Sequence, residues 1–258
     1  MPDLPSGRSY SNRTAMIAAV FISDLHLHPE EKQITKRFFD FVKWAAKNSR
    51  AVYILGDFFH VWPGDDALDA WSISIAEQLA WLASQGVSIY FMHGNRDFLL
   101  GQRFAQLANI RLLEEPAVIK LGVERVLLVH GDRYCTKDVR HQWLRRLTRN
   151  RIFPKLFLRI PFKIRNKFVN KVRAYSQSGR QLPSWQFEVV SDSMLEHMKQ
   201  LNVKVVIHGH IHKPGLNIHE YQGKSYSQFV LSDWDDKPVL VCYDNSNGFY
   251  FDLIAEEE

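Results

Sequence analysis

A run of apolar residues that ends abruptly in a carboxylate, amide or imidazole occurs five times in this chain of 258 residues. Each run is short and rich in β-branched residues, which predicts a strand covered on both faces. The runs are residues 16–22, 52–55, 87–92, 126–129 and 203–207. Because sites in open α/β sheets form at the carboxyl ends of strands, the repetition predicts one site built from five strands.

Segments with helical spacing separate several of these runs, and alternating strands follow the last one. The expected helices are residues 34–45, 73–83, 99–108 and 189–201, where apolar residues repeat every three or four positions. The expected later strands are residues 225–231, 239–243 and 249–254. Together these elements predict an α/β fold in which two mixed sheets form a sandwich flanked by helices.

The polar residues after the five runs form a set of oxygen and nitrogen donors without cysteine. The set comprises Asp24, His26, Asp57, Asn95, His130, His210 and His212. Such a set suits manganese, iron, cobalt or zinc rather than calcium, which prefers oxygen alone. The carboxylate of Asp57 can span two ions, and a water molecule held between two cations loses a proton near neutral pH. The set therefore predicts a hydroxide generated at a pair of divalent metals.

The net charge of +5 conceals a segregation of charge along the chain. Residues 133–187 contain 15 lysines and arginines and one acidic residue, Asp138, whereas the rest of the chain contains 18 basic and 27 acidic residues. Such a block favours an anionic partner over a solvated helical face, because its charges repel one another. Within residues 154–173 apolar side chains alternate with these charges, as in an interfacial membrane helix or a lid over acyl chains; packing on the sandwich is the alternative.

Length and composition favour a single domain in a reducing compartment. Cys135 and Cys242 are too few for a disulfide framework, which fits the cytoplasm. No apolar run approaches the length needed to cross a bilayer. We expect residues 1–15 to be a disordered lead-in and residues 16–258 to form one domain, with a basic helical insert at about residues 134–187.

The strand-end motifs resemble, in order, the five blocks of the calcineurin-like metallophosphoesterases. The matching residues are Asp24-x-His26, Gly56-Asp57, Gly94-Asn95-x-Asp97, His130-Gly131 and Gly209-His210-x-His212. The resemblance implies an αββα sandwich and a two-metal phosphoester or pyrophosphate hydrolase, with manganese as the first choice of metal. It assigns Asp24, His26, Asp57 and His212 to one ion, and Asp57, Asn95, His130 and His210 to the other. The histidines at positions 28, 93 and 208 match no ligand position.

Further motifs resemble the UDP-2,3-diacylglucosamine diphosphatases of lipid A synthesis. They are Asp24-Leu25-His26-Leu27, residues 56–66, residues 94–101, Cys135-Thr136 and the basic insert. This resemblance implies hydrolysis of the diphosphate of UDP-2,3-diacylglucosamine to lipid X (2,3-diacylglucosamine 1-phosphate) and UMP. It implies a cytoplasmic enzyme held peripherally on the anionic inner leaflet of the inner membrane. The implied catalytic residues are Asn95, Arg96 and His210, and the implied substrate contacts add Asp138 and Ser176.

Arg96 stands where the wider superfamily commonly has a histidine that can protonate the leaving group. Cleavage of a pyrophosphate releases a phosphate monoester whose last proton has a pKa of about 6, so it departs without an acid. A fixed guanidinium is better suited to bind the diphosphate and to neutralise charge that develops on it. Arg96 is therefore expected to act as a clamp.

The second resemblance weakens in two places. After Ser176 the diphosphatases tend to continue with lysine and asparagine, whereas this chain has Gln177 followed by polar residues, among which Arg180 can serve as the substrate contact. His60 and Pro63 stand where an acid and an aliphatic residue are expected, and His60 is close enough in sequence to Asp57 to lie near the metals. These departures indicate a divergent diphosphatase or a relative that acts on another diphosphate lipid.

Two other classes of function compete with this interpretation. A nucleic-acid phosphodiesterase would use the basic block on phosphates, but the rest of the chain is net acidic and the insert has few tyrosines or tryptophans on which bases could stack. A scaffold without enzymatic activity is disfavoured because no ligand position has been lost.

Overall fold

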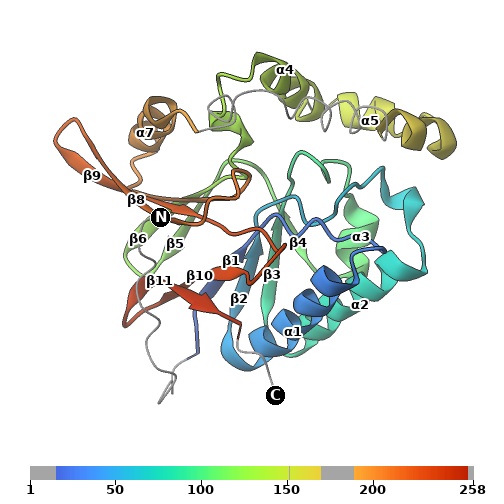
Figure 1. Cartoon of the computed structure of the whole chain (residues 1–258), viewed down its shortest axis with the longest axis horizontal. Helices are drawn as coiled ribbons and strands as arrows, with labels where there is room; N and C mark the ends of the chain where they lie inside the picture. The colour runs from blue at the N-terminus through green and yellow to red at the C-terminus, as the bar shows by residue number, and fades with distance from the viewer. Residues whose placement is uncertain (1–15, 151, 170–188, 255–258) are drawn as a thin grey trace.

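The computed structural model describes residues 16–150, 152–169 and 189–254. Two mixed β-sheets lie face to face, with helices on the outer face of each (Figure 1). The strand orders are β11-β10-β1-β2-β3-β4 and β5-β6-β7-β9-β8. The predicted sandwich is therefore confirmed, whereas the expected lead-in at residues 1–15 lies outside the described residues.

The two sheets contain the five predicted site-bearing strands. The first sheet consists of β1 (Ala19–Ile22), β2 (Ala51–Ile54), β3 (Ser88–Met92), β4 (Arg111–Leu113), β10 (Val239–Asp244) and β11 (Gly248–Leu253). The second consists of β5 (Ala117–Leu121), β6 (Glu124–Leu128), β7 (Val205–His208), β8 (Gly215–Tyr221) and β9 (Lys224–Val230). Strands β1 to β4 run parallel, as do β6, β7 and β9. The predicted strand ends therefore lie at one edge of each sheet, those of β1, β2 and β3 in the first sheet and those of β6 and β7 in the second.

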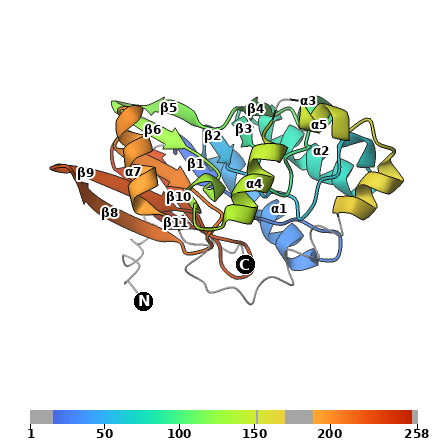
Figure 2. The same ribbon diagram turned by 90° about the horizontal axis from the view of Figure 1, so that it is seen from above.

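The helices that cover the two sheets form two groups at opposite ends of the view from above (Figure 2). The first group is α1 (Lys32–Asn48), α2 (Ala70–Ser84) and α3 (Gln102–Leu107), and the second is α7 (Ser191–Gln200). The insert contributes α4 (Val139–Thr148), α5 (Phe153–Phe157) and a helix at residues 162–169. In the same view α4 lies between the two groups, whereas α5 lies at the end that holds α2 and α3. Two short 3-10 turns, η1 (Asp65–Ala67) and η2 (Asp132–Tyr134), precede α2 and α4.

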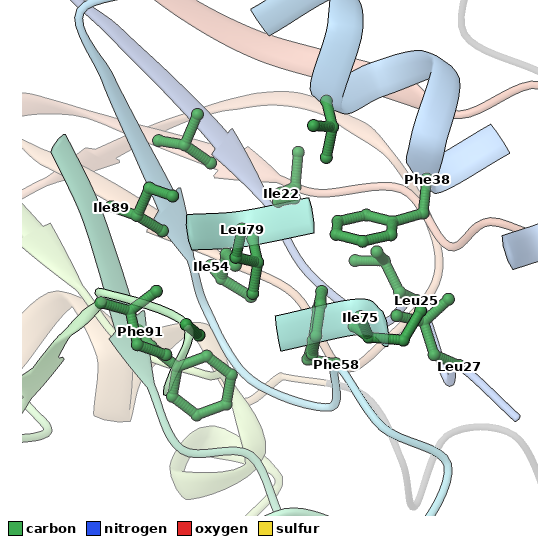
Figure 3. Packing of buried hydrophobic residues seen from close by; sticks show 14 of the residues in the cluster. Ile22, Leu25, Leu27, Phe38, Ile54, Phe58, Ile75, Leu79, Ile89 and Phe91 are labelled. Carbon is green, nitrogen blue, oxygen red and sulfur yellow. The ribbon is translucent and has the colours of Figure 1, made fainter. Parts of the chain in front are cut away.

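The central strands have apolar residues at consecutive positions because both of their faces are covered, one by helices and the other by the opposite sheet. In β1, Ile22 points to the first group of helices, whereas Phe21 points to the second sheet. Figure 3 shows Phe38 of α1 and Ile75 of α2 in the same cluster as Ile22 and its neighbours in β2 and β3. This packing fixes the strand ends from which the site is built.

Three strands, β4, β5 and β8, were not expected from the sequence. All three lie at the edge of a sheet, where one side of the strand has no neighbour among the described strands. Edge strands bury less surface, and β8 has mostly exposed or half-buried residues. The apolar run that marks a buried strand is therefore weak or absent in these segments.

Part of the basic insert is bound to the sandwich by two arginines, Arg165, which is buried, and Arg145, which is half-buried. Arg165 is fully buried and donates hydrogen bonds to the carbonyl of Pro63 and to two carbonyls of the insert, and it forms an ion pair with Asp66. Arg145 of α4 bridges Glu115 and Asp132 at 3.0 and 3.1 Å. These positive charges are compensated inside the fold, so only the remaining ones can act on an anionic partner.

Candidate active site

The seven predicted donor residues meet at the carboxyl ends of the parallel strands. Asp24 and His26 follow β1, Asp57 follows β2 and Asn95 follows β3 in the first sheet. The second sheet contributes the histidine after β6 and two histidines after β7. The structure therefore brings together side chains from five separate places in the sequence.

The donors form two neighbouring trios. Asp24, His26 and His212 make the first trio, and within it the ligand atoms lie within 4.8 Å of one another. Asp57, His130 and His210 make the second on the same criterion. The amide of Asn95 joins the second trio, with its Oδ1 3.0 Å from Nε2 of His130. This division matches the two sets of ligands that the sequence motifs imply.

Five of these residues adopt backbone conformations that glycine or asparagine usually occupies. The φ angles are 56° at Asp24, 52° at His26, 52° at Asp57, 73° at His210 and 51° at His212. A left-handed conformation disfavours most side chains, and such residues cluster at functional sites. The sharp turns after the strands therefore aim donor side chains back across the sheet edge.

Glycines in the motifs allow the five turns to approach one another. A Cβ at Gly94 would lie 2.1 Å from Oδ1 of Asp57, and a Cβ at Gly56 would lie 2.8 Å from Nδ1 of His130. Asp97 is fully buried and accepts hydrogen bonds from the amides of Gly94 and Phe58 at 2.7 and 2.8 Å. In the Gly-Asn-x-Asp motif, Asn95 therefore faces the site, and Asp97 stabilises the loop through its hydrogen bonds to backbone amides.

His130 presents Nε2 to the site because Nδ1 is engaged elsewhere. Nδ1 lies 2.9 Å from the carbonyl of Leu55 and must donate to it, since a carbonyl oxygen only accepts. The ring is fully buried, and Nε2 lies 3.6 Å from Oδ1 of Asp57. A backbone partner of this kind fixes the tautomer of a histidine that binds metal through its other nitrogen.

The electrostatics of the two trios favour one cation in each. Burial alone would lower the pKa of His130, but the carboxylates of Asp57, Asp24 and Asp132 raise it to about 9. Burial would likewise lower the pKa of His212, but the neighbouring carboxylates of Asp233 and Asp24 raise it to about 10. The site therefore attracts positive charge at two places, and divalent ions would compete with these protons.

Buried atoms without partners also fit the presence of metal. Oδ1 of Asp24 and Nδ1 of His26 make no hydrogen bond within the part of the chain that the structure describes. Buried polar atoms are almost always hydrogen-bonded, so these two atoms within a cluster of carboxylates and imidazoles fit a site that can hold a cation. The donor set, with oxygen and imidazole nitrogen only, suits divalent transition metals.

A sequence profile of the calcineurin-like phosphoesterases matches residues 18–214, which span all seven donors. The chain belongs to the calcineurin-like phosphoesterase family. The resemblance predicted from the strand-end motifs is thereby confirmed, and the protein is a hydrolase of the metallophosphoesterase class. Membership in this family together with the two donor trios supports a requirement for divalent metal.

Several curated relatives are similar to this chain over most of their length. A UDP-2,3-diacylglucosamine hydrolase of Pseudomonas entomophila (strain L48) is 42% identical over 217 residues, which cover 84% of this chain and 90% of the relative. The hydrolase of the same name from Pseudomonas paraeruginosa (strain DSM 24068 / PA7) is 41% identical over 220 residues, covering 85% and 92%. That from Stutzerimonas stutzeri (strain A1501) is 39% identical over 236 residues, covering 90% and 96%.

In this phosphoesterase Arg96 lies against the second trio. Its backbone amide donates to Oδ1 of Asp57 at 2.9 Å, and its Nε lies 3.4 Å from Oδ2 of the same carboxylate. The side chain is 26% exposed, so the guanidinium is held at the surface of the site rather than buried beneath it. Its position is that of a cation able to meet an anionic substrate next to the donors.

The other histidines of the phosphoesterase motifs have partners outside the trios. Nε2 of His93 lies 2.7 Å from the carbonyl of Leu100. His208 is fully buried, with Nδ1 2.8 Å from the carbonyl of Gly209 and Nε2 2.8 Å from the side-chain Nε2 of Gln228. Neither histidine belongs to a trio among the described residues, in line with the expectation that they match no ligand position.

The expected substrate contacts in the insert are only partly described. Asp138 lies at the N-terminus of α4, where its Oδ1 accepts a hydrogen bond from the amide of His141 at 2.9 Å. The other two, Ser176 and Arg180, lie outside the described residues. The ring of His141 lies 5.3 Å from that of His210, so the start of α4 borders the second trio.

One residue of the site was missed in the sequence. Oδ2 of Asp233 lies 3.2 Å from Nδ1 of His212 and orients the ring so that Nε2 faces Asp24 at 3.5 Å. A signal was present, because the apolar run of β9 also ends in polar residues, Ser232 and Asp233. The pattern used for the first five strands therefore identifies this residue as well.

Proposed function

We propose that this phosphoesterase hydrolyses the diphosphate of UDP-2,3-diacylglucosamine and releases UMP and 2,3-diacylglucosamine 1-phosphate. The observation that carries the proposal is the combination of two donor trios with a guanidinium held against the second. Three relatives named for this hydrolysis share about two fifths of their residues with it over most of their length. A divergent relative acting on another diphosphate lipid is the second candidate.

In this proposal the two trios would hold two divalent ions, with manganese as the first choice. Asp24, His26 and His212 would hold one ion, and His130, His210 and Asn95 would hold the other, with Asp57 shared between them. Bound divalent ions would lower the pKa of a water molecule and offset charge on the phosphate. Burial, together with the neighbouring charge of His130, lowers the pKa of His210 to about 3, so this imidazole is neutral and available as a ligand.

The chain itself positions and neutralises the diphosphate. The guanidinium of Arg96 binds a phosphate oxygen, and its contact with Asp57 places that oxygen next to the second trio. The amide of Asn95 orients the phosphoryl group that is attacked. The phosphate leaving group needs no proton from the enzyme at neutral pH, since its last pKa is about 6.

The insert offers a place for the acyl chains and for a membrane surface. A cavity of about 270 Å³ beside the strand ends is lined by aromatic side chains, including Phe59, Trp62 and Trp71, and by Asn166 of the insert. Trp143 of α4 and Phe168 are 66% and 54% exposed. No helix in the described ranges is long and apolar enough to span a membrane. From the exposed aromatic side chains and the basic composition of the insert we propose peripheral contact with the anionic cytoplasmic leaflet.

The test is mass analysis of the products formed with manganese from three substrates. We expect UMP and 2,3-diacylglucosamine 1-phosphate from UDP-2,3-diacylglucosamine, and no cleavage of a cyclic nucleotide or of single-stranded DNA. The control is Asp57→Asn, which lacks a carboxylate of the second trio and should therefore form no product. Cleavage of DNA in preference to the lipid, abolished in the same variant, would replace the proposal with a nuclease.

A further inference from the structure

Arg96 is held at three points, and one of them is a histidine that the metal trios do not use. Its backbone amide and its Nε contact the two oxygens of Asp57 at 2.9 and 3.4 Å. Its Nη1 lies 3.3 Å from Nδ1 of His60. Among the described residues Nη2 makes no hydrogen bond, so this corner of the guanidinium is the one available to a ligand.

We propose that His60 is a positioning residue that fixes the guanidinium plane of Arg96 against the diphosphate. The inference rests on the proposed function, because it takes the diphosphate as the ligand of Arg96. The contact of the guanidinium with Asp57 is made through Nε, and a single contact leaves the guanidinium free to rotate about it. A second contact on Nη1 removes that freedom, and fixed donors stabilise developing charge better than mobile ones.

The chemistry of the contact defines the state of His60. A guanidinium has only donors, so Nδ1 of His60 must carry a lone pair and the ring proton must lie on Nε2. A neutral acceptor orients Arg96 and leaves its positive charge for the ligand. A carboxylate at the same position would hold the guanidinium equally well but would neutralise it.

The ring of His60 is itself held in place. Its backbone amide donates to the carbonyl of Leu27 at 3.0 Å, next to the parallel bridge between Leu27 and Phe59 that extends the pairing of β1 and β2. The ring packs edge-on against His28, with centroids 5.4 Å apart. His60 is therefore rigid enough to transmit a fixed orientation to Arg96.

Substitutions that remove or restore the acceptor test the proposal in the manganese-loaded enzyme. His60→Leu should lower kcat/KM for UDP-2,3-diacylglucosamine about tenfold, as expected for loss of a hydrogen bond to a charged group, with kcat falling more than KM rises. His60→Asn, whose Oδ1 can replace Nδ1, should recover activity to within about threefold. His219→Leu removes an imidazole that contacts Gln228 in the second sheet rather than His60 or Arg96, and should leave kcat unchanged.

A double-mutant cycle separates positioning from independent effects. If His60 acts through Arg96, then His60→Leu should have no further effect in an Arg96→Ala background. Metal content should remain that of the wild type in every variant. An undiminished tenfold effect in the Arg96→Ala background, or loss of metal from His60→Leu, would overturn the proposal.

A measurement that does not depend on turnover tests the contact between His60 and Arg96 separately from the proposed substrate. The ¹⁵N chemical shift of an imidazole nitrogen reports whether it carries a proton, and Nδ1 of His60 should be the unprotonated one. Arg96→Ala should shift that resonance and leave the remote His219 unchanged. If UDP-2,3-diacylglucosamine is not cleaved but the resonance responds, the positioning contact stands and the substrate assignment fails. A protonated Nδ1 would overturn the contact whatever the substrate.

Discussion

The turn after β7 packs directly on a carboxylate of the site: a Cβ at Gly209 would lie 2.1 Å from Oδ2 of Asp24. The same oxygen accepts hydrogen bonds from Ser23 at 2.6 Å and from the amide of His210 at 2.8 Å. The backbone of one sheet thus fixes a donor that belongs to the other. The absence of a side chain at Gly209 is therefore as necessary to the first trio as the carboxylate itself.

We expect Gly209→Ala to damage the first trio through steric conflict alone. The added methyl group must displace Asp24, which should cost about 1–3 kcal/mol of stability, as for other overpacked sites. The bound metal, measured by elemental analysis, should fall toward one ion per chain. Gly223→Asn is the matched control, because Gly223 has open space around it and a φ of 71° that asparagine tolerates. Full metal content in the alanine variant would contradict the packing described here.

The two trios should lose metal separately. We expect two divalent ions per chain in the wild type and about one in either His212→Gln or His130→Gln, because each substitution removes a donor from only one trio. Asp57→Asn should lower the content further, since its carboxylate is proposed to serve both ions. Treatment with a chelator should abolish activity in the wild type, and added manganese should restore it. Retention of both ions in all three variants would refute the assignment.

Loss of Arg165 should detach the insert from η1. Its guanidinium is fully buried and hydrogen-bonded to three carbonyls, so Arg165→Met should lower the free energy of unfolding by about 3–5 kcal/mol. Asp66→Asn should cost less, because that carboxylate is 51% exposed. Chemical denaturation measures both effects. Lys163→Met, an exposed substitution on the same helix, should be close to neutral, and an equal loss there would show that the buried contacts are not the cause.

His197 should make stability depend on pH on the acidic side of neutrality. Burial and the nearby charge of Arg133 lower the pKa of His197, and Nδ1 of the neutral ring accepts a hydrogen bond from the hydroxyl of Tyr134 at 2.8 Å. A pKa below the unfolded value of about 6.5 means that stability is full above that pH and is lost as the pH falls below it. The loss in free energy of unfolding between about pH 7.5 and about pH 5.5 should be smaller in His197→Gln. An equal loss in both proteins would exclude this contribution.

The fold and the position of a site residue could both be predicted where one segment contains an apolar strand followed directly by a polar side chain. The run before Asp57 is apolar because β2 is covered on both faces, and the carboxylate follows where the strand ends. The same holds for the strands before Asp24, Asn95, His130 and His210, so the sandwich and the meeting of these side chains at one edge could be predicted together.

The remaining features depend on partners that are distant in the sequence. Arg145, Arg149 and Arg165 look like part of a free cationic surface until Glu115, Asp132 and Asp66 are seen beside them. The edge strands carry too little apolar pattern to be recognised alone. The contact between His60 and Arg96 could not be foreseen either, because 36 residues separate them.

The left-handed backbone at five donor positions implies a cost that the folded protein carries permanently. A residue in such a conformation costs on the order of 1–3 kcal/mol, and glycine adopts it freely. Replacing Asp57 by glycine should therefore yield a protein more resistant to heat than replacing it by alanine, although both would be inert. Selection for thermal stability alone would favour glycine at these positions. The aspartates and histidines found there therefore lower the stability of the fold in return for the donor atoms of the site.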